Sequence, residues 1–342
     1  MDDKAQAMVL GSFIADALSL GVHWVYNTNV IDKKWGRAEN YIKPEMPTYH
    51  PTKDLGEFTH YGDQAMALLE SVAASSGFSL HHFARSWQDF FKSYDGYFDS
   101  ATKETLDNLA AGKDITEAGS GSDDLAGAAR MAALVYCYRN DEDKLIESVR
   151  LQTAFTHNHP EVIDSAEFFA RVTVKVLGGV MPVAAINQVV ADGFSQGPFA
   201  GWVDDGLKSA DTETRQAVLD FGQMCEIEPA FPCVIHLIAR YEENLSLCLI
   251  DNAMAGGDRV IVSEIPGTTR DAVDVRLDKD GRTLLIIDTA GVRKKNKMSD
   301  DIEFYSYVRA TRSIHRADVV MFLIDAAVPV SQVDKKLAKL IQ

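Results

Sequence analysis

The sequence has few features of a secreted, membrane-bound or nucleic-acid-binding protein. Its 342 residues include only four cysteines, none in a CxxC pair, and all four lie in apolar stretches: Cys137, Cys225, Cys233 and Cys248. This pattern favours buried free thiols in a reducing compartment over a metal site. No run of about 18 apolar residues occurs, and the first residues lack the basic-then-apolar pattern of a signal peptide. We therefore expect a soluble, cytoplasmic protein with no membrane partner.

Basic residues are scarce in most of the chain. Residues 1–258 hold 19 Lys and Arg against 38 Asp and Glu, a net charge of −19, whereas residues 259–342 hold 15 against 12, a net charge of +3. Because nucleic-acid binding needs clustered Lys and Arg, the acidic part is not expected to bind DNA or RNA. The change of sign indicates a domain boundary near residue 258.

No linker marks this boundary. Residues 255–270 read AGGDRVIVSEIPGTTR, and apolar residues begin at Val260, directly after the join. Flexible linkers are instead rich in Pro, Gly or Ser. We interpret the chain as two partial modules fused end to end, residues 1–258 and residues 259–342.

Helical periodicity dominates the first module. It predicts helices at about 4–20, from 63 onward, and at 80–94, 125–138, 141–154, 160–178, 182–195, 212–224 and 233–249. No stretch before residue 258 alternates as a strand does. The expected fold class is all-α, and many helices of medium length favour an orthogonal array over a four-helix bundle. Between helices, residues 35–58 carry three prolines and form a loop long enough to cover a cleft.

Two short segments carry candidate binding residues. His23–Asn27 reads HWVYN, which predicts either a core plug or a wall on which a ligand stacks. In residues 58–64, FTHYGDQ, the periodicity starts a helix near Gly62, which gathers polar groups at a helix N-terminus, where free N–H groups favour anions. The alternative is that Asp63 only caps this helix.

Arg130 and the turn at 156–160 are two further polar features whose role has to be weighed. Arg130 lies inside a predicted helix, either as a surface charge or as an anion ligand. The turn THNHP at 156–160 holds two histidines one residue apart, for which a polar loop is favoured over a metal site.

Several segments, in their order, resemble the ADP-ribosylglycohydrolase family. They are GSFIADALSLGVHW, THYGDQ, the Gly-Ser-rich turn before Arg130, THNH and NAMAGGD, and they span about residues 8–258. The resemblance implies an all-α fold whose cleft holds one or two Mg²⁺ or Mn²⁺ ions. These ions would orient ADP-ribose, free or attached to a protein, and a water that cleaves the bond at the ribose C1.

The metal positions depart from the family pattern, as in a divergent, J1-crystallin-like branch. HYGDQ stands where the family has Thr-Asp-Asp-Thr-Gln, so both ligand aspartates are replaced. A further acidic ligand falls on His23, and the late Gly-Gly-Asp-Thr-Asp breaks after Asp258. The resemblance leaves Asp63 and Asp258 as catalytic and metal-binding candidates. The wider ligand-binding set that it implies is Asp16, His23, Trp24, Tyr26, Thr59, His60, Tyr61, Gly62, Gln64, Ser120, Ser122, Gly256 and Gly257.

The second module has the pattern of a truncated α/β domain. Alternation predicts strands around 273–277 and 284–286, joined by an Asp280-Gly281 turn. A helix at 302–317, a buried strand at 318–325 and the start of a last helix follow. PGTTRD and DTAGVRKK at this spacing resemble the second G domain of the Der/EngA ribosome-assembly GTPases.

This resemblance assigns nucleotide contacts to four residues of the module. Thr269 or Thr268 would be the switch threonine, Asp288 would hold Mg²⁺ through water, and the Gly291 amide would meet the γ-phosphate. No GxxxxGK[ST] and no Asn-Lys-x-Asp motif occurs in the chain. We therefore expect useful GTP affinity to be lost, and ribosome association is not expected.

Three functions follow from these patterns. The first is an ADP-ribosylglycohydrolase-like hydrolase with a foreign tail, which would cleave a ribosyl bond with the help of a metal ion and whose activity the lost ligands could impair. The second is a GTPase-like protein for which a partner supplies the missing phosphate loop. The third is a non-catalytic chimera that at most binds a ribosyl ligand.

Overall fold

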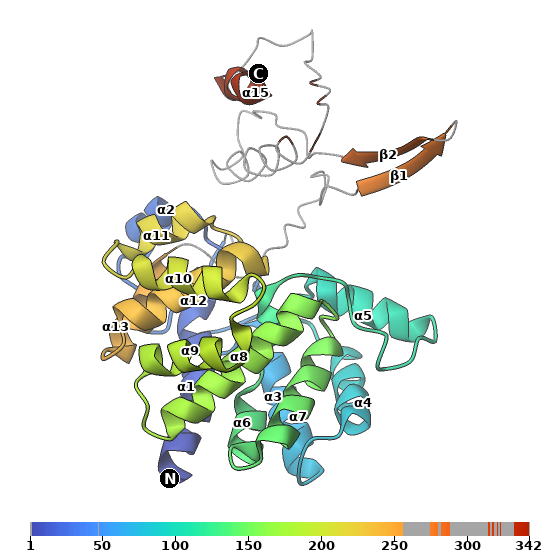
Figure 1. The fold of residues 1–342 in the computed structure, drawn as a ribbon, viewed down its shortest axis with the longest axis vertical. Helices are drawn as coiled ribbons and strands as arrows, with labels where there is room; N and C mark the ends of the chain where they lie inside the picture. Colours follow the sequence, from blue (N-terminus) through green and yellow to red (C-terminus); the bar gives the residue numbers. More distant parts are fainter. Residues whose placement is uncertain are drawn as a thin grey trace. The chain divides into compact units, whose positions relative to one another are not determined.

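A computed structural model describes residues 2–46, 48–255, 274–279, 282–287 and 332–341, together with positions 314, 317, 320 and 322. The chain divides into two compact units, residues 1–261 and residues 262–342, each of which is described by itself (Figure 1). We call them the helical unit and the tail unit.

The helical unit consists of helices and the turns that join them. In chain order they are α1 (Asp2–Ser19), η1 (Leu20–Val22), α2 (Thr28–Lys34), α3 (His60–Ala74), α4 (Leu80–Phe91), α5 (Ser100–Ala110), η2 (Leu125–Ala128), α6 (Ala132–Tyr138), α7 (Glu142–Ala154), α8 (Pro160–Leu177), α9 (Pro182–Val189), the π-helical η3 (Val190–Phe194), α10 (Phe199–Lys208), α11 (Thr214–Phe221), α12 (Ile227–Arg240) and α13 (Leu245–Met254). Within residues 2–46 and 48–255 the only β-type pairing is two isolated bridges, Ser120 with His157 and Asp124 with Glu226. The all-α prediction is confirmed.

Capping side chains set several helix starts that periodicity alone placed wrongly. The predicted helix at 233–249 is two helices, because α12 ends at Arg240 and Asn244 accepts a hydrogen bond from the Leu247 amide to start α13. The predicted helix at 125–138 begins as the short turn η2, capped by Asp124, and becomes α-helical only at Ala132. Helices α2, α5 and α10 were not predicted.

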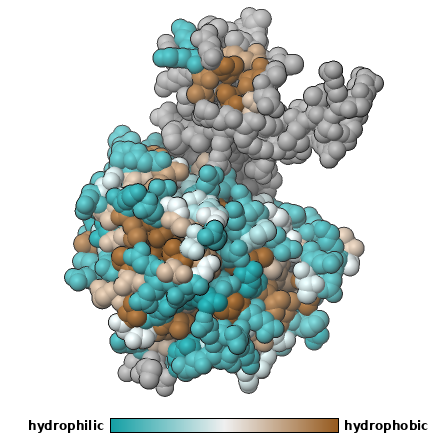
Figure 2. All heavy atoms as spheres, in the orientation of Figure 1, coloured by the Kyte–Doolittle hydropathy of each residue, from teal (hydrophilic) through white to brown (hydrophobic). Residues whose placement is uncertain are grey.

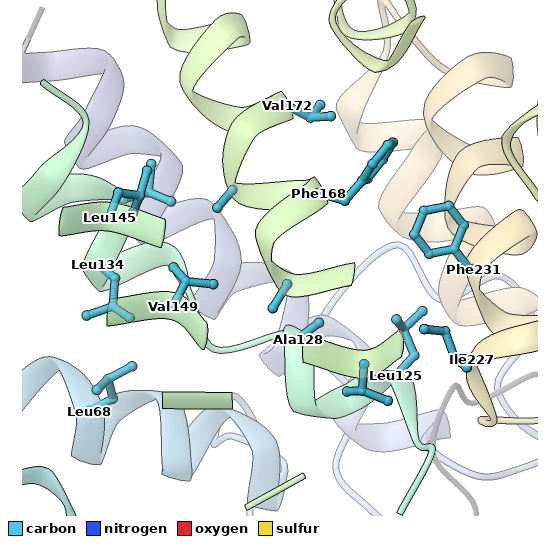
Figure 3. Close-up of a cluster of buried hydrophobic side chains, with 14 of the residues drawn as sticks. Leu68, Leu125, Ala128, Leu134, Leu145, Val149, Phe168, Val172, Ile227 and Phe231 are labelled. Atoms are coloured by element: carbon cyan, nitrogen blue, oxygen red, sulfur yellow. The ribbon is translucent and has the colours of Figure 1, made fainter. Parts of the chain in front are cut away.

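Within its described residues, the helical unit is held together by three small apolar clusters and by one large apolar core. Helix α8 lies at its centre and packs against α7, α9 and η2, while α10 packs against α12. Phe168 of α8 and Phe231 of α12 are fully buried and pack edge to face, with 5.2 Å between ring centroids (Figure 3). Burying such a side chain contributes about 1.5–3 kcal/mol relative to leaving it in water. On the face of the helical unit shown in Figure 2, the surface is largely hydrophilic, with apolar patches between the polar side chains.

Helix α1 and the turn after it are unusually apolar. By length and composition alone, Lys4–Val22 could cross a membrane, as a core helix of a soluble protein also could. In this structure α1 packs against α3, α6 and α13, and Ala5, Leu18 and Leu20 are buried. One side of α1 is thus part of the packed interior, while Leu10 and Ile14 on this helix are exposed.

The end of α13 is tied down by side chains from earlier in the chain. Arg215 of α11 donates through Nε to the Met254 carbonyl at 2.9 Å and forms two hydrogen bonds to the Asp32 carboxylate of α2 at 2.7 and 2.8 Å. Gln223 donates to the Ala255 carbonyl at 3.3 Å. The last carbonyls of the helix, which lack partners within it, are satisfied in this way.

In the tail unit the described elements are a hairpin and a helix. Strands β1 (Asp274–Lys279) and β2 (Arg282–Ile287) pair antiparallel, with Lys279 opposite Arg282 at the turn, and α15 spans Gln332–Ile341. The predicted strands and last helix are confirmed. The predicted helix at 302–317 and strand at 318–325 lie almost wholly outside the described residues, as do Thr268, Thr269, Asp288 and Gly291.

Candidate functional site

The candidate site begins at the N-terminus of α3. Thr59 caps this helix, because its Oγ1 accepts a hydrogen bond from the Tyr61 amide at 3.1 Å. Asp63 therefore lies in the first turn and is not the cap, so the capping alternative for Asp63 is wrong. The predicted grouping of Thr59, His60, Tyr61 and Asp63 at a helix start is correct.

Asp16 of α1 is fully engaged with this helix start. Its Oδ2 accepts from the Thr59 amide at 2.8 Å, and its Oδ1 accepts from the Thr59 hydroxyl at 2.6 Å. Burial raises the pKa of Asp16, and the two hydrogen bonds from Thr59 act in the opposite sense. Asp16 is thus a structural partner of Thr59 in this arrangement.

Gly62 is the point of closest approach between α3 and Asp16. A Cβ at position 62 would lie 2.3 Å from Asp16 Oδ2 and 2.8 Å from the Phe58 Cβ. Position 62 is where the family pattern has the second ligand aspartate. The packing of Asp16 against Gly62 leaves no room for that side chain.

Asp63 carries a lysine as its counter-ion. Lys53 Nζ lies 2.5 Å from Asp63 Oδ2, and the Tyr94 hydroxyl donates to the same oxygen at 2.6 Å. The side chains of Lys53 and Asp63 are only 13% and 15% exposed. Burial, together with the Asp63 carboxylate, raises the pKa of Tyr94, so that its hydroxyl stays protonated and donates.

Aromatic and imidazole rings pack together beside Asp63. We call this group the ring cluster; its members are His23, Trp24, Tyr49, His50, His60, Tyr61 and Tyr97. His23 Nδ1 lies 2.6 Å from His50 Nε2, so one imidazole donates to the other. Burial lowers the pKa of His50 far below its usual range, which keeps this ring neutral.

Trp24 is the strained member of the ring cluster. Its φ angle is 62°, a left-handed conformation that costs a bulky residue about 1–3 kcal/mol and that persists only where the surroundings enforce it. The side chain is buried, stacks on His23 with centroids 4.5 Å apart, and its Nε1 makes no described hydrogen bond. In this structure the rings of His23 and Trp24 are buried in the interior of the unit, which matches the core-plug alternative.

Behind the ring cluster lies a buried polar network. Asp99 Oδ2 lies 3.4 Å from His60 Nε2, and Asp99 Oδ1 caps α5. Gln64 Oε1 accepts from Trp87 Nε1 and from Arg130 Nη1, each at 2.9 Å. Arg130 is 2% exposed, and burial lowers its pKa to about 10. The surface-charge alternative for Arg130 is therefore wrong, and the anion-ligand alternative stays a prediction.

The remaining predicted residues lie around this network. Ser120 donates to Glu104 Oε2 at 2.5 Å and accepts from the Ser122 amide, so the two serines shape the turn before η2. Tyr26 packs at the edge of the ring cluster. His157 is buried, where the sequence favoured a polar loop, and burial lowers its pKa to about 3.

Five residues of the site escaped the sequence analysis: Tyr49, His50, Lys53, Tyr97 and Asp99. The first three come from the proline-containing loop 35–58, which was expected to cover a cleft and which carries His50 and Lys53 onto His23 and Asp63. Nothing in a loop without periodicity indicates which of its side chains point inward.

The described residues do not fit a hard divalent cation. Among them, no three His, Cys, Asp or Glu side chains are arranged to hold a metal ion. Mg²⁺ and Mn²⁺ prefer several oxygen ligands in regular geometry, whereas Asp63 Oδ2 already receives an ammonium and a phenol. Gly256, Gly257 and Asp258 lie outside the described residues, so the pairing of Asp63 with Asp258 stays a prediction.

Three cavities of the helical unit lie away from the ring cluster. One of about 390 Å³ is lined by residues of α2, α11 and α13, among them Arg215, and by Arg37, which follows α2. Others of about 370 and 410 Å³ are lined by residues near η3 and near Tyr241. No predicted site residue lines any of the three. The candidate site is therefore defined by its side chains and not by one of these cavities.

Two family models match the chain and overlap at the join. One described as ADP-ribosylglycohydrolase matches residues 1–267, and one described as 50S ribosome-binding GTPase matches residues 249–342. A solved structure entitled ADP-ribosylglycohydrolase-related protein complex is similar with a TM-score of 0.54 and 20% identity, over 75% of this chain and 82% of that chain. At this identity the similarity shows the fold alone.

The tail is similar to part of GTPase Der from several bacteria. The protein of Heliobacterium modesticaldum is 45% identical over 107 residues, which are 31% of this chain and 24% of that protein. That of Chlorobium phaeobacteroides is 52% identical over 89 residues, 26% of this chain and 20% of that protein. The chain thus spans a quarter or less of the length of these relatives. Since the first family model covers most of the sequence, this protein belongs to the ADP-ribosylglycohydrolase family and carries a fragment similar to a GTPase domain.

Proposed function

We propose that the helical unit is a hydrolase that cleaves the glycosidic bond of an ADP-ribosyl or related ribosyl ligand. Family membership supports the class of reaction, and the setting of Asp63 supports the site. Asp63 lies in the first turn of α3, where the helix dipole stabilises a carboxylate. Its side chain is largely buried, and a ligand would reach it only at the 15% that stays exposed.

The two oxygens of Asp63 have different tasks in this proposal. Both described hydrogen bonds end on Oδ2, which fixes the orientation of the carboxylate. Oδ1 then holds the attacking water. The water oxygen bonds to the ribose C1 and its proton passes to Asp63, while the glycosidic bond breaks and its electron pair leaves with the departing group. That group takes a proton from solvent.

The ring cluster provides the wall beside this carboxylate. Tyr26, Tyr49 and Tyr97 are partly exposed at its edge and pack against the buried Trp24 and Tyr61. Aromatic rings with polar tips suit the face of a ribose or a base. The expected partner is therefore an ADP-ribosyl-type substrate, either a small molecule or a modified protein.

A second candidate is binding of the same ligand without cleavage. It is favoured by one observation: the buried rings of His23, Trp24 and His60 fill the centre of the site, and none of the three cavities above is lined by them. Such a site would hold the ligand at its rim, away from a well-enclosed carboxylate.

Release of ADP-ribose from a modified protein separates the candidates. Wild type is compared with Asp63→Asn and with the control Asp89→Asn, which changes an exposed carboxylate of α4. For the hydrolase, Asp63→Asn lowers the rate about 10²- to 10⁴-fold and Asp89→Asn leaves it unchanged. Equal rates in all three remove Asp63 from the mechanism. Saturable binding of ADP-ribose by calorimetry without release supports the second candidate, and neither binding nor release overturns both.

A further inference from the structure

The counter-ion of Asp63 is built into the chain. Lys53 Nζ lies 2.5 Å from Asp63 Oδ2 and 5.4 Å from the centroid of the Tyr94 ring, whose hydroxyl donates to the same carboxylate oxygen. At 13% and 15% exposure, the two charged side chains are largely withdrawn from water. We infer that the Lys53 ammonium is the resident cation of Asp63, and that Asp63 is not a ligand of a divalent metal ion.

The loop that carries Lys53 is anchored at His50, three residues earlier. The Lys53 amide donates to the His50 carbonyl at 3.1 Å, and the His50 amide donates to Thr48 Oγ1 at 3.0 Å. The His50 side chain is fully buried and hydrogen-bonds to His23. A metal ion on Asp63 would have to expel an ammonium whose backbone is held three residues away from a buried ring. Displacing the ammonium would leave the Lys53 charge without its carboxylate partner in a largely buried setting.

Within residues 2–46 and 48–255, the groups around Asp63 offer few further oxygens to a metal ion. Both Asp16 oxygens accept hydrogen bonds from Thr59. The Tyr94 hydroxyl is already engaged as a hydrogen-bond donor to Asp63. Position 62, next to Asp63, admits no side chain, because Asp16 occupies the space of a Cβ. This set suits one monovalent organic cation better than an ion that needs about six oxygen ligands.

Chemical labelling of lysines in the full chain tests the inference without reference to any reaction. Acetylation of Lys53 by an N-hydroxysuccinimide ester is followed by peptide mass spectrometry, with Lys43 as the internal control. Lys43 belongs to the same loop and pairs with Asp54 at an exposed site, with side chains 58% and 67% exposed. We expect Lys53 to react about tenfold or more slowly than Lys43, with or without 10 mM Mn²⁺, since a buried, paired ammonium is shielded from the reagent. An Mn²⁺-dependent rise of Lys53 labelling to the rate of Lys43 would overturn the inference.

Mn²⁺ binding, followed by the loss of the free-ion electron paramagnetic resonance signal, provides the second measurement. Wild type and Asp63→Asn are expected to take up Mn²⁺ equally, whether that uptake is nil or arises at other acidic groups. A single tight site in wild type that Asp63→Asn loses contradicts the inference. Because neither measurement uses ADP-ribose, the inference stands or falls separately from the proposed hydrolysis.

Discussion

Gly62 and Asp16 are in contact through the space that a side chain at position 62 would need. The distance from the ideal Cβ position to Asp16 Oδ2 is 2.3 Å, although nonbonded carbon and oxygen atoms normally stay beyond 3 Å. The contact links α3 to α1 and fixes where Thr59 and Asp63 point.

Gly62→Ala is therefore expected to destabilise the helical unit by about 1–3 kcal/mol, the usual cost of overpacking. The matched control is Gly11→Ala in α1, where nothing lies within 4 Å of the added Cβ. There the substitution should stabilise by about 0.5–1 kcal/mol, since alanine favours a helix more than glycine does. Urea unfolding of both variants measures the two changes, and a Gly62→Ala protein as stable as wild type would show that Asp16 moves aside freely.

Trp24 allows a test of backbone strain. At a φ of 62°, glycine has no Cβ penalty, so Trp24→Gly should be about 1 kcal/mol more stable than Trp24→Ala. Both variants lose the same ring, and their difference reports the backbone alone. At Trp87, which lies within α4, the order should reverse, with Trp87→Ala the more stable. The same order at both positions would argue against a left-handed Trp24.

His157 is expected to make stability depend on pH in mildly acidic solution. Burial lowers its pKa to about 3, below its value of about 6.5 in the unfolded chain, so the folded state binds this proton less readily. The stabilising contribution is then complete above pH 6.5 and is lost as the pH falls toward 3. Between about pH 6 and pH 4 the loss is about 1.4 kcal/mol per unit.

The variant His157→Gln should unfold in urea with a shallower pH dependence over this interval, while the exposed-site control His81→Gln should follow wild type. His50, whose pKa is also lowered, contributes to both proteins and cancels in the comparison. Superimposable pH profiles for wild type and His157→Gln would show that His157 titrates normally in the folded protein.

The tail is expected not to bind GTP usefully. Switch-like PGTTRD and DTAG segments are present, but the chain contains no GxxxxGK[ST] sequence to surround the β-phosphate with amides and a lysine. Titration of a fluorescent GTP analogue with Mg²⁺ should show no saturation up to about 1 mM, a weak-binding limit of about −4 kcal/mol. A complete Der-type GTPase serves as the positive control. A dissociation constant near 1 μM would show that other groups replace the phosphate loop.

The fold of the helical unit was largely predictable because it follows local rules. Apolar spacing located α7, α8 and the start of α4 nearly to the residue, although α4 ends at Phe91 and not at Tyr94, and Pro160 opens α8 as its position indicates. The helix at Ser100–Ala110 was missed, since its start depends on the capping of Thr102 by Asp99 and its apolar face is weak. Local patterns also could not show that α12 and α13 are separate.

The candidate site was predictable only in part, because its chemistry depends on contacts distant in sequence. Thr59, His60 and Asp63 were grouped correctly, as they share one helix start. The pairing of Lys53 with Asp63 and of His23 with His50 arises from how loop 35–58 folds back, 10 and 27 residues away. The buried Arg130 likewise depends on a hydrogen bond to Gln64, which is 66 residues earlier.

The side chains that hold the end of α13 bear on how such a chain can arise. Arg215, Asp32 and Gln223 all precede the join: Arg215, which is itself held by Asp32, donates to the Met254 carbonyl, and Gln223 donates to the Ala255 carbonyl. The described hydrogen bonds to the end of α13 thus come from residues of the helical unit itself. A gene that encodes this unit could therefore gain a different continuation after Ala255 without removing these described hydrogen bonds.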